Sequence, residues 1–265
     1  MGAAWLMTSL TPSPLYVASV QTATYLPVLL MGLPAGAIAD IFDRRRVLLI
    51  TQAWMTVAAG LLAFSTWFGF TGPNLLLLFT FLLGTGATVN APAWQAILPE
   101  LVPRKQLPSA IALNSMGFNI SRAIGPALGG LLIAWVNPAA VFAVNAISFV
   151  GVVAVIYGWK REPTSSRDQS ERVVNAIMAG ARYIRYAPEL HGVLLRTFLF
   201  VIPASALWSL LPLLAKEDLQ RGSSGYGIML AALGAGSVAV AANLPRLRAA
   251  VGVEWLVSAA ILLFG

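Results

Sequence analysis

Few residues of this chain carry groups that could do chemistry, and most of those groups are charged. The chain has no Cys and a single His, so it supplies neither a thiolate nucleophile nor a Cys/His zinc site. It also has no glycine-rich phosphate loop of the kind that indicates ATP-driven work. Its densest cluster of ionisable side chains comprises Asp40, Asp43, Arg44, Arg45 and Arg46. These charges can pair and separate between two conformations. They form no nucleophile–base pair and no metal-ligand set, so we expect no enzyme activity, no cofactor and no metal.

The elements that position this charge cluster are two long apolar runs, roughly residues 17–39 and 47–68. Each run reaches the length of about 20 residues that a helix needs to cross a bilayer. Two such runs joined by a short charged connection indicate a helical hairpin in a membrane. The composition agrees, because 58% hydrophobic and only 10% charged residues leave too little polar surface to cover a soluble globule. We therefore predict an all-α integral membrane protein.

The net charge of +7 is also explained by a membrane setting. The basic residues lie at the ends of apolar runs and not along one face of a soluble domain, which argues against a nucleic-acid partner. We expect the partners to be the lipid bilayer and a small-molecule substrate.

Apolar runs of about twenty residues predict seven complete spans, at residues 15–39, 47–69, 74–93, 108–134, 138–158, 190–214 and 224–244. The runs 1–10 and 253–265 are too short to cross, so we expect truncated spans at both ends. No basic region precedes the first apolar run and the later spans are themselves insertion signals, so we expect no cleavable signal peptide. Basic connections alternate with uncharged ones, and only Lys216 and Arg221 fall on the second side. The basic side is predicted to face the cytoplasm, in a multi-pass protein of the cell inner membrane.

The polar segment 160–189 predicts a division into three parts. These are an N-terminal transmembrane bundle at 1–159, a cytoplasmic linker at 160–189 and the start of a C-terminal bundle at 190–265. Apolar residues at helical spacing over 173–184 predict an amphipathic helix within the linker, lying on the inner leaflet.

A weak internal repeat relates the two bundles. Gly36, Asp40 and the Arg44 to Arg46 triplet recur as Gly236, Val240 and the pair Arg246 and Arg248, each at the end of the second span of its half. Duplicated bundles of this kind are typical of secondary transporters.

These motifs resemble those of a known family. The pattern Gly36-x-x-x-Asp40-x-x-Asp43-Arg44-Arg45-Arg46 resembles the signature between helices 2 and 3 of the major facilitator superfamily, with Asp43 where many members have Gly. The run Gly125-Pro126-Ala127-Leu128-Gly129-Gly130 is similar to the export-associated motif of helix 5. The phrases over 92–103 and 113–115 are similar to the enterobactin-exporter-like branch, also called transmembrane secretion effectors.

The resemblance implies a fold of twelve helices in two halves, with a substrate cavity between them that opens alternately to either side of the membrane. Against that template, the chain covers the end of helix 1 to the start of helix 9, an incomplete bundle of about 8 helices. One departure concerns coupling, because Phe81 stands where many proton-coupled members carry an Arg. We expect the complete protein to be monomeric.

The charge cluster is the first candidate for a conformational switch. Gly36, one turn before Asp40, removes side-chain bulk so that a neighbouring helix can approach. The Asp40 carboxylate can then meet an Arg or a helix N-terminus in a closed state, a latch worth about 1 to 3 kcal/mol. The alternative is that Asp40, Asp43 and the three arginines only fix the topology.

A second candidate gate comprises Gly125, Pro126, Gly129 and Gly130. Small residues let two helix backbones pack closely, and Pro126 frees a carbonyl and permits a bend. The functional interpretation is a gate or a seal against leak, and the alternative is simple close packing.

A third candidate is a polar stripe in the same span. Ser115, Asn119 and Arg122 recur on one helix face, and Arg122 lies about 20 Å from the basic end at 1.5 Å per residue. A charge at that depth normally faces a cavity or a partner. We hypothesise that the stripe lines the substrate cavity and that Arg122 favours anionic or catecholate-like groups. The alternative is an Arg122 paired structurally with backbone or a distant helix.

Together these features predict a secondary active exporter of small molecules, such as a siderophore or a hydrophobic drug, that works by alternating access and is driven by protons. The alternatives are a passive channel, a non-transporting membrane scaffold or an inactive fragment. A membrane-embedded enzyme is disfavoured by the lack of catalytic side chains inside the spans.

Overall fold

A computed structural model describes residues 1–159, 186, 188–252 and 255–259. These residues form helices without any strand, which confirms the predicted all-α class. The helices are α1 (Gly2–Leu10), α2 (Pro14–Ile41), α3 (Arg44–Trp67), α4 (Pro73–Leu101), α5 (Leu107–Trp135), α6 (Pro138–Gly158), α8 (Pro188–Glu217) and α9 (Ser223–Val251), with a short 3₁₀ turn, η1, at Arg104–Gln106. The amphipathic helix predicted within the linker lies outside the described residues.

Local sequence explains where most of these helices begin. Proline occupies one of the first two positions of α2, α4, α5 and α6, where its fixed φ suits a helix and its missing N–H costs nothing. Two caps add a side-chain bond: Asp43 Oδ1 accepts from Arg46 N at 2.9 Å, and Asn137 Oδ1 accepts from Ala140 N at 2.9 Å. Because Asp43 caps α3, the arginine triplet belongs to the first turn of that helix and not to a connection.

Two helices run well beyond the ends that the sequence predicted. The span expected at 74–93 continues to Leu101 through Pro92 and Pro99, and the span expected at 224–244 continues to Val251. The sequence boundaries were set where apolarity drops. A helix can nevertheless extend beyond the hydrocarbon layer, because its backbone bonds remain satisfied there.

Six described helices contain a segment long and apolar enough to cross a membrane, in α2, α3, α4, α6, α8 and α9. The seventh predicted span, 108–134, is present as the 29-residue helix α5 but is not among the six. Its polar residues, including Asn114, Asn119 and Arg122, lower its mean hydropathy. Only Gly130 and Ile133 of α5 are buried, so these polar residues lie on its exposed surface.

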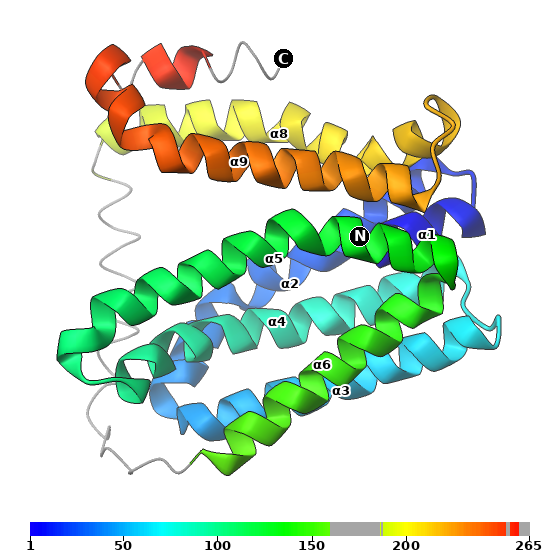
Figure 1. Ribbon diagram of the computed structural model, residues 1–265, viewed down its shortest axis with the longest axis horizontal. Coiled ribbons are helices and arrows are strands. Elements are labelled where there is room, and N and C mark those ends of the chain that lie inside the picture. The colour runs from blue at the N-terminus through cyan, green and yellow to red at the C-terminus, as the bar shows by residue number, and fades with distance from the viewer. Residues whose placement is uncertain (160–185, 187, 253–254, 260–265) are drawn as a thin grey trace.

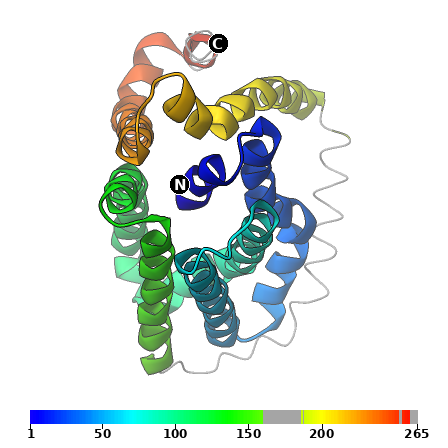
Figure 2. The ribbon, with the colours of Figure 1, turned by 90° about the vertical axis from the view of Figure 1, so that its right-hand side faces the viewer.

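The helices pack with two distinct ends (Figure 1). We call the end that holds Arg44, Arg45, Arg104 and Lys105 the basic end; the opposite end holds the loops at 68–72, 136–137 and 218–222. Two clusters of buried apolar residues hold α2, α3, α4 and α6 together, one towards each end. In Figure 2, α1 lies on the inner side of α2, α5, α8 and α9.

Small and polar residues allow close contacts within this group. A Cβ at Gly84 would lie 2.8 Å from the Thr24 carbonyl oxygen, so α4 and α2 approach backbone to backbone there. Between α3 and α4, Asn90 Oδ1 accepts hydrogen bonds from Thr51 Oγ1 at 3.1 Å and from Gln52 Nε2 at 3.2 Å. The packing therefore combines van der Waals contact with interhelical hydrogen bonds, the two forces that act between helices in lipid.

A matched pair of leucines on α4 tests the position of the core. Leu76 is fully buried, whereas Leu78 is 51% exposed on the outside of the bundle. We expect Leu76→Ala to lower the free energy of unfolding by about 2 to 5 kcal/mol, because a cavity remains among packed helices. Leu78→Ala should cost much less. Thermal unfolding of the purified protein in detergent measures both, and equal losses would contradict the assigned core.

Candidate functional site: the charge cluster and the α5–α9 seam

Arg44 joins the beginning of α3 to the end of α4. Its Nη1 donates to Glu100 Oε1 at 2.7 Å and to the Ala96 carbonyl oxygen at 3.1 Å. Both side chains of the pair are partly exposed, so the ion pair contributes at most about 1 kcal/mol to stability. Its main effect is to fix the direction in which Arg44 points.

Arg45 joins the beginning of α3 to the end of α6. Its Nε donates to the Ile156 carbonyl oxygen at 3.0 Å and its Nη2 to the Tyr157 carbonyl oxygen at 2.5 Å. The last four carbonyls of a helix have no partner within it and carry the negative end of the helix dipole. The guanidinium also lies 5.9 Å from the centre of the Tyr157 ring. Arg45 thus caps α6 from a neighbouring helix.

The two acidic residues of the charge cluster, Asp43 and Asp40, differ in whether the described structure gives them a hydrogen-bond partner. Asp43 caps α3, a role that its place just before the arginine triplet could have indicated. Asp40 makes no hydrogen bond or ion pair with the part of the chain that the structure describes. The close helix approach expected at Gly36 is also absent there, because no described atom lies within 4 Å of a Cβ built on it. In this conformation, the described contacts of Arg44 and Arg45 stay within α3, α4 and α6.

The helices α5 and α9, which belong to different predicted bundles, are in close contact along a seam. A Cβ at Gly130 would lie 2.6 Å from the Ser223 carbonyl oxygen, and a Cβ at Gly227 would lie 2.5 Å from the Pro126 carbonyl oxygen. Closer to the middle of the helices, a Cβ at Gly234 would lie 2.9 Å from Ala123 Cα. No side chain fits at these three glycine positions without moving a backbone.

A hydrogen bond reinforces this seam, because Ser223 Oγ donates to the Gly130 carbonyl oxygen at 3.1 Å. The sequence singled out Gly130 and Pro126 on α5 but missed their partners on α9. Ser223, Gly227 and Gly234 share one helix face, and Ser223-x-x-x-Gly227 is a small-xxx-small pattern that could have identified them.

The predicted glycine motif divides into three environments. Gly130 meets α9, Gly129 meets Met1, with the Met1 sulfur 3.3 Å from a built Cβ, and Gly125 has no described atom within 4 Å. The motif is therefore not a single contact surface. Only Pro126 and Gly130 lie in the seam.

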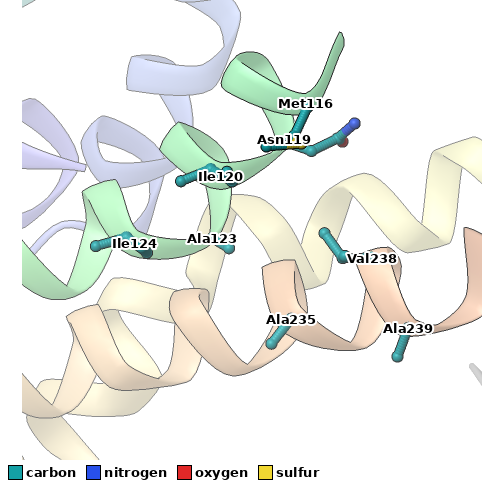
Figure 3. Close-up of a pocket in the computed structure, with 8 residues that line it drawn as sticks. All are labelled: Met116, Asn119, Ile120, Ala123, Ile124, Ala235, Val238 and Ala239. Carbon is teal, nitrogen blue, oxygen red and sulfur yellow. The ribbon is translucent and has the colours of Figure 1, made fainter. Parts of the chain in front are cut away.

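A cavity of about 550 Å³ opens where the seam ends. Towards the basic end, past Ala123 and Gly234, α5 and α9 diverge, and the cavity lies between them (Figures 1 and 3). Its lining is apolar except for one amide, and comprises Met116, Asn119, Ile120, Ala123, Ile124, Ala235, Val238 and Ala239. Asn119 Nδ2 donates to the Ser115 carbonyl oxygen at 2.9 Å, within α5.

The predicted polar stripe is only partly brought together by this cavity. Asn119 lines it, whereas Ser115 and Arg122 do not. Arg122 lies two helical turns before Gly129, so it shares the face of α5 that meets Met1 in the interior. Its side chain is exposed and makes no hydrogen bond or ion pair within the described ranges. Arg122 is therefore an exposed cation on the face of α5 that also carries Gly129.

Comparison with known proteins assigns this chain to a family. The family described as transmembrane secretion effector matches residues 1–265. The staphyloferrin A transporter of Staphylococcus aureus is 25% identical over 100% of this chain and 67% of its own length. The multidrug efflux pump Tap of Mycolicibacterium fortuitum is 30% identical over 70% of this chain and 47% of its own. An uncharacterized MFS-type transporter, y4rN of Sinorhizobium fredii, is 24% identical over 84% of this chain and 55% of its own.

This chain thus spans between about half and two thirds of these relatives. The relatives are transporters, which confirms the prediction of a non-enzymatic membrane protein. The match over all 265 residues supports the same conclusion as the helical bundle and its motifs. The chain belongs to the transmembrane secretion effector family of the major facilitator superfamily.

Proposed function

We propose that this chain forms most of a secondary active exporter of small molecules that works by alternating access and is driven by protons. The observation that carries the proposal is the asymmetry of the α5–α9 pair. The two helices are in backbone contact towards the opposite end, and a cavity separates them towards the basic end. A pair of bundles closed at one end and open at the other is one of the two states that alternating access requires.

The positive-inside rule gives this state a direction. If the basic end faces the cytoplasm of the cell inner membrane, the described conformation is open to the cytoplasm and closed to the outside. An exporter takes up its substrate in that state. The names of two relatives, a staphyloferrin A transporter and a multidrug efflux pump, support a small-molecule cargo.

Our proposal for the cargo rests on the cavity between α5 and α9 and on the charge of Arg122. The cavity offers apolar walls and one amide, and Arg122 offers an unpaired positive charge within the described residues. We propose a substrate with an apolar body and an anionic or catecholate-like group. Ser115 lies on the same α5 face as Arg122 and belongs to the same proposed binding region.

The charge cluster is proposed to act in the other state. When the basic end closes, Asp40 gains a partner from the second bundle, while Arg44 and Arg45 keep the ends of α3, α4 and α6 together as one body. The proposal keeps the division into a bundle at 1–159, a linker at 160–189 and a second bundle from 190. A latch of this kind is worth about 1 to 3 kcal/mol.

A transport assay on the complete protein tests the function. The protein, reconstituted in vesicles with an imposed proton gradient, should move a siderophore or a hydrophobic drug, and an uncoupler should abolish concentrative movement. Transport that survives complete uncoupling would rule out proton drive. The absence of transport for every compound of both classes would favour a scaffold.

The α5–α9 seam is tested by two glycines of the same motif. Gly130→Ala places a Cβ 2.6 Å from the Ser223 carbonyl oxygen, whereas Gly125→Ala meets no described atom. Alanine favours a helix over glycine by up to about 1 kcal/mol, so only the close contact distinguishes the two variants. We expect Gly130→Ala to reduce the transport rate at least about tenfold, equivalent to about 1.4 kcal/mol. Gly125→Ala should transport normally, and equal rates would show that the seam need not close.

Arg122 is tested by its dependence on substrate charge. Arg122→Gln should raise the KM for an anionic substrate by about tenfold, since a charge-assisted bond is worth about 1.5 to 3 kcal/mol, and leave a neutral drug unaffected. Arg104→Gln, which removes an exposed arginine at the basic end outside the charge cluster, is the control for net charge. Unchanged transport of every substrate by Arg122→Gln would exclude a role in binding.

A further inference from the structure

A lysine at the end of α8 binds a helix of the other bundle. Lys216 Nζ donates to the Thr8 carbonyl oxygen, at the point where α1 and α8 both reach the opposite end. From the sequence, Lys216 was only one of two basic residues predicted on the non-cytoplasmic side, where the charges of Glu217 and Asp218 balance those of Lys216 and Arg221. Neither carboxylate forms an ion pair with Lys216 in the part of the chain that the structure describes.

The Thr8 carbonyl has no partner within its own helix. It belongs to the last turn of α1, whose final carbonyls lie beyond the reach of intrahelical N–H groups. The chain becomes extended at Thr11, and the next residue, Pro12, has no N–H to offer. An ammonium group is well suited to this position, because it satisfies the carbonyl and opposes the negative end of the helix dipole.

Apolar contacts around this bond join the same two bundles. Trp5 stacks on Tyr226 with ring centres 5.9 Å apart and an angle of 21° between the rings. Met1 and Trp5 pack against the buried residues Leu211, Ala215 and Tyr226 of α8 and α9. Figure 2 shows α1 between α2 and the α8–α9 pair. These contacts join α1 to α8 and α9 at the opposite end, and Lys216 adds a directional hydrogen bond there.

We propose that Lys216 is a latch residue that stabilises the state closed at the opposite end, by capping α1 across the boundary between the bundles. This inference rests on the proposed alternating access. The bond can exist only while α1 and α8 are in contact, so it stabilises one state and not the other. When the opposite end opens, water replaces Lys216 at the Thr8 carbonyl.

The competing account is that Lys216 only places its charge in the membrane interface. Both accounts require a cation, but only the latch requires contact with α1. Lys216→Met keeps most of the stem and removes the charge, and Lys216→Arg keeps the charge and the donors. Arg221→Met is a matched control, because Arg221 is an exposed cation at the same end of the molecule. The Arg221 side chain makes no described bond to α1.

The opening can be measured as a distance in the complete protein. The chain contains no Cys, so a spin label can be attached at each of two introduced cysteines, Val136→Cys and Leu219→Cys. These residues are 54% and 53% exposed, and they lie at the opposite end in different bundles. Pulsed electron paramagnetic resonance then gives the fractions of molecules in which the two spin labels are close together or far apart.

We expect Lys216→Met to raise the ratio of long to short separations at least about fivefold, the lower limit of typical coupling between sites. Lys216→Arg and Arg221→Met should leave the ratio unchanged. A Lys216→Met protein that folds, transports and keeps the original distances would overturn the latch but not the proposed function. If Lys216→Met shifts the distances but the protein that keeps Lys216 transports no substrate, the latch stands and the proposed function is overturned.

Discussion

The packing of α5 against α9 through glycine is the contact on which the rest of the arrangement depends. In lipid, apolar surface gives helices no reason to associate, so contact relies on close van der Waals approach and on hydrogen bonds. Gly130, Gly227 and Gly234 remove the side chains that would keep two backbones apart, and Ser223 adds a bond to the Gly130 carbonyl. The two helices touch there and are separated by a cavity where larger residues, Met116 and Val238, stand.

Two residues of the arginine triplet, Arg44 and Arg45, contribute to this arrangement by joining α3 to α4 and α6 at the basic end. Arg44 and Arg45 reach the ends of α4 and α6, where backbone carbonyls and Glu100 accept their hydrogen bonds. A bundle whose helices are joined at one end can move as a single body, which is what a change between two open states requires. Lys216 makes the equivalent kind of bond between bundles, to a carbonyl of α1. Cations at helix ends thus serve two different purposes in one chain.

Much of the fold could be predicted because membrane helices leave a strong signal in sequence. Apolar runs placed all the long described helices, including α6 at Pro138–Gly158 without error. The candidate site was predicted less completely. Gly130 and Pro126 were identified, but Gly125 has no described atom within 4 Å of a built Cβ, and Asn119 lines the cavity whereas Arg122 does not. Spacing along one helix indicates which residues share a face, but not which helix lies against that face.

The sequence alone determined the all-helical class, the membrane setting and the side on which positive charge gathers, because these depend on composition and on runs along the chain. Only the tertiary structure decided the partners: that Asp43 caps α3 while Asp40 stays without a described partner, that Gly227 and Gly234 face α5, and that Lys216 reaches Thr8. The physical reason is that each of these contacts joins groups on different elements or selects between near neighbours. Packing in three dimensions sets such distances, and periodicity in sequence does not.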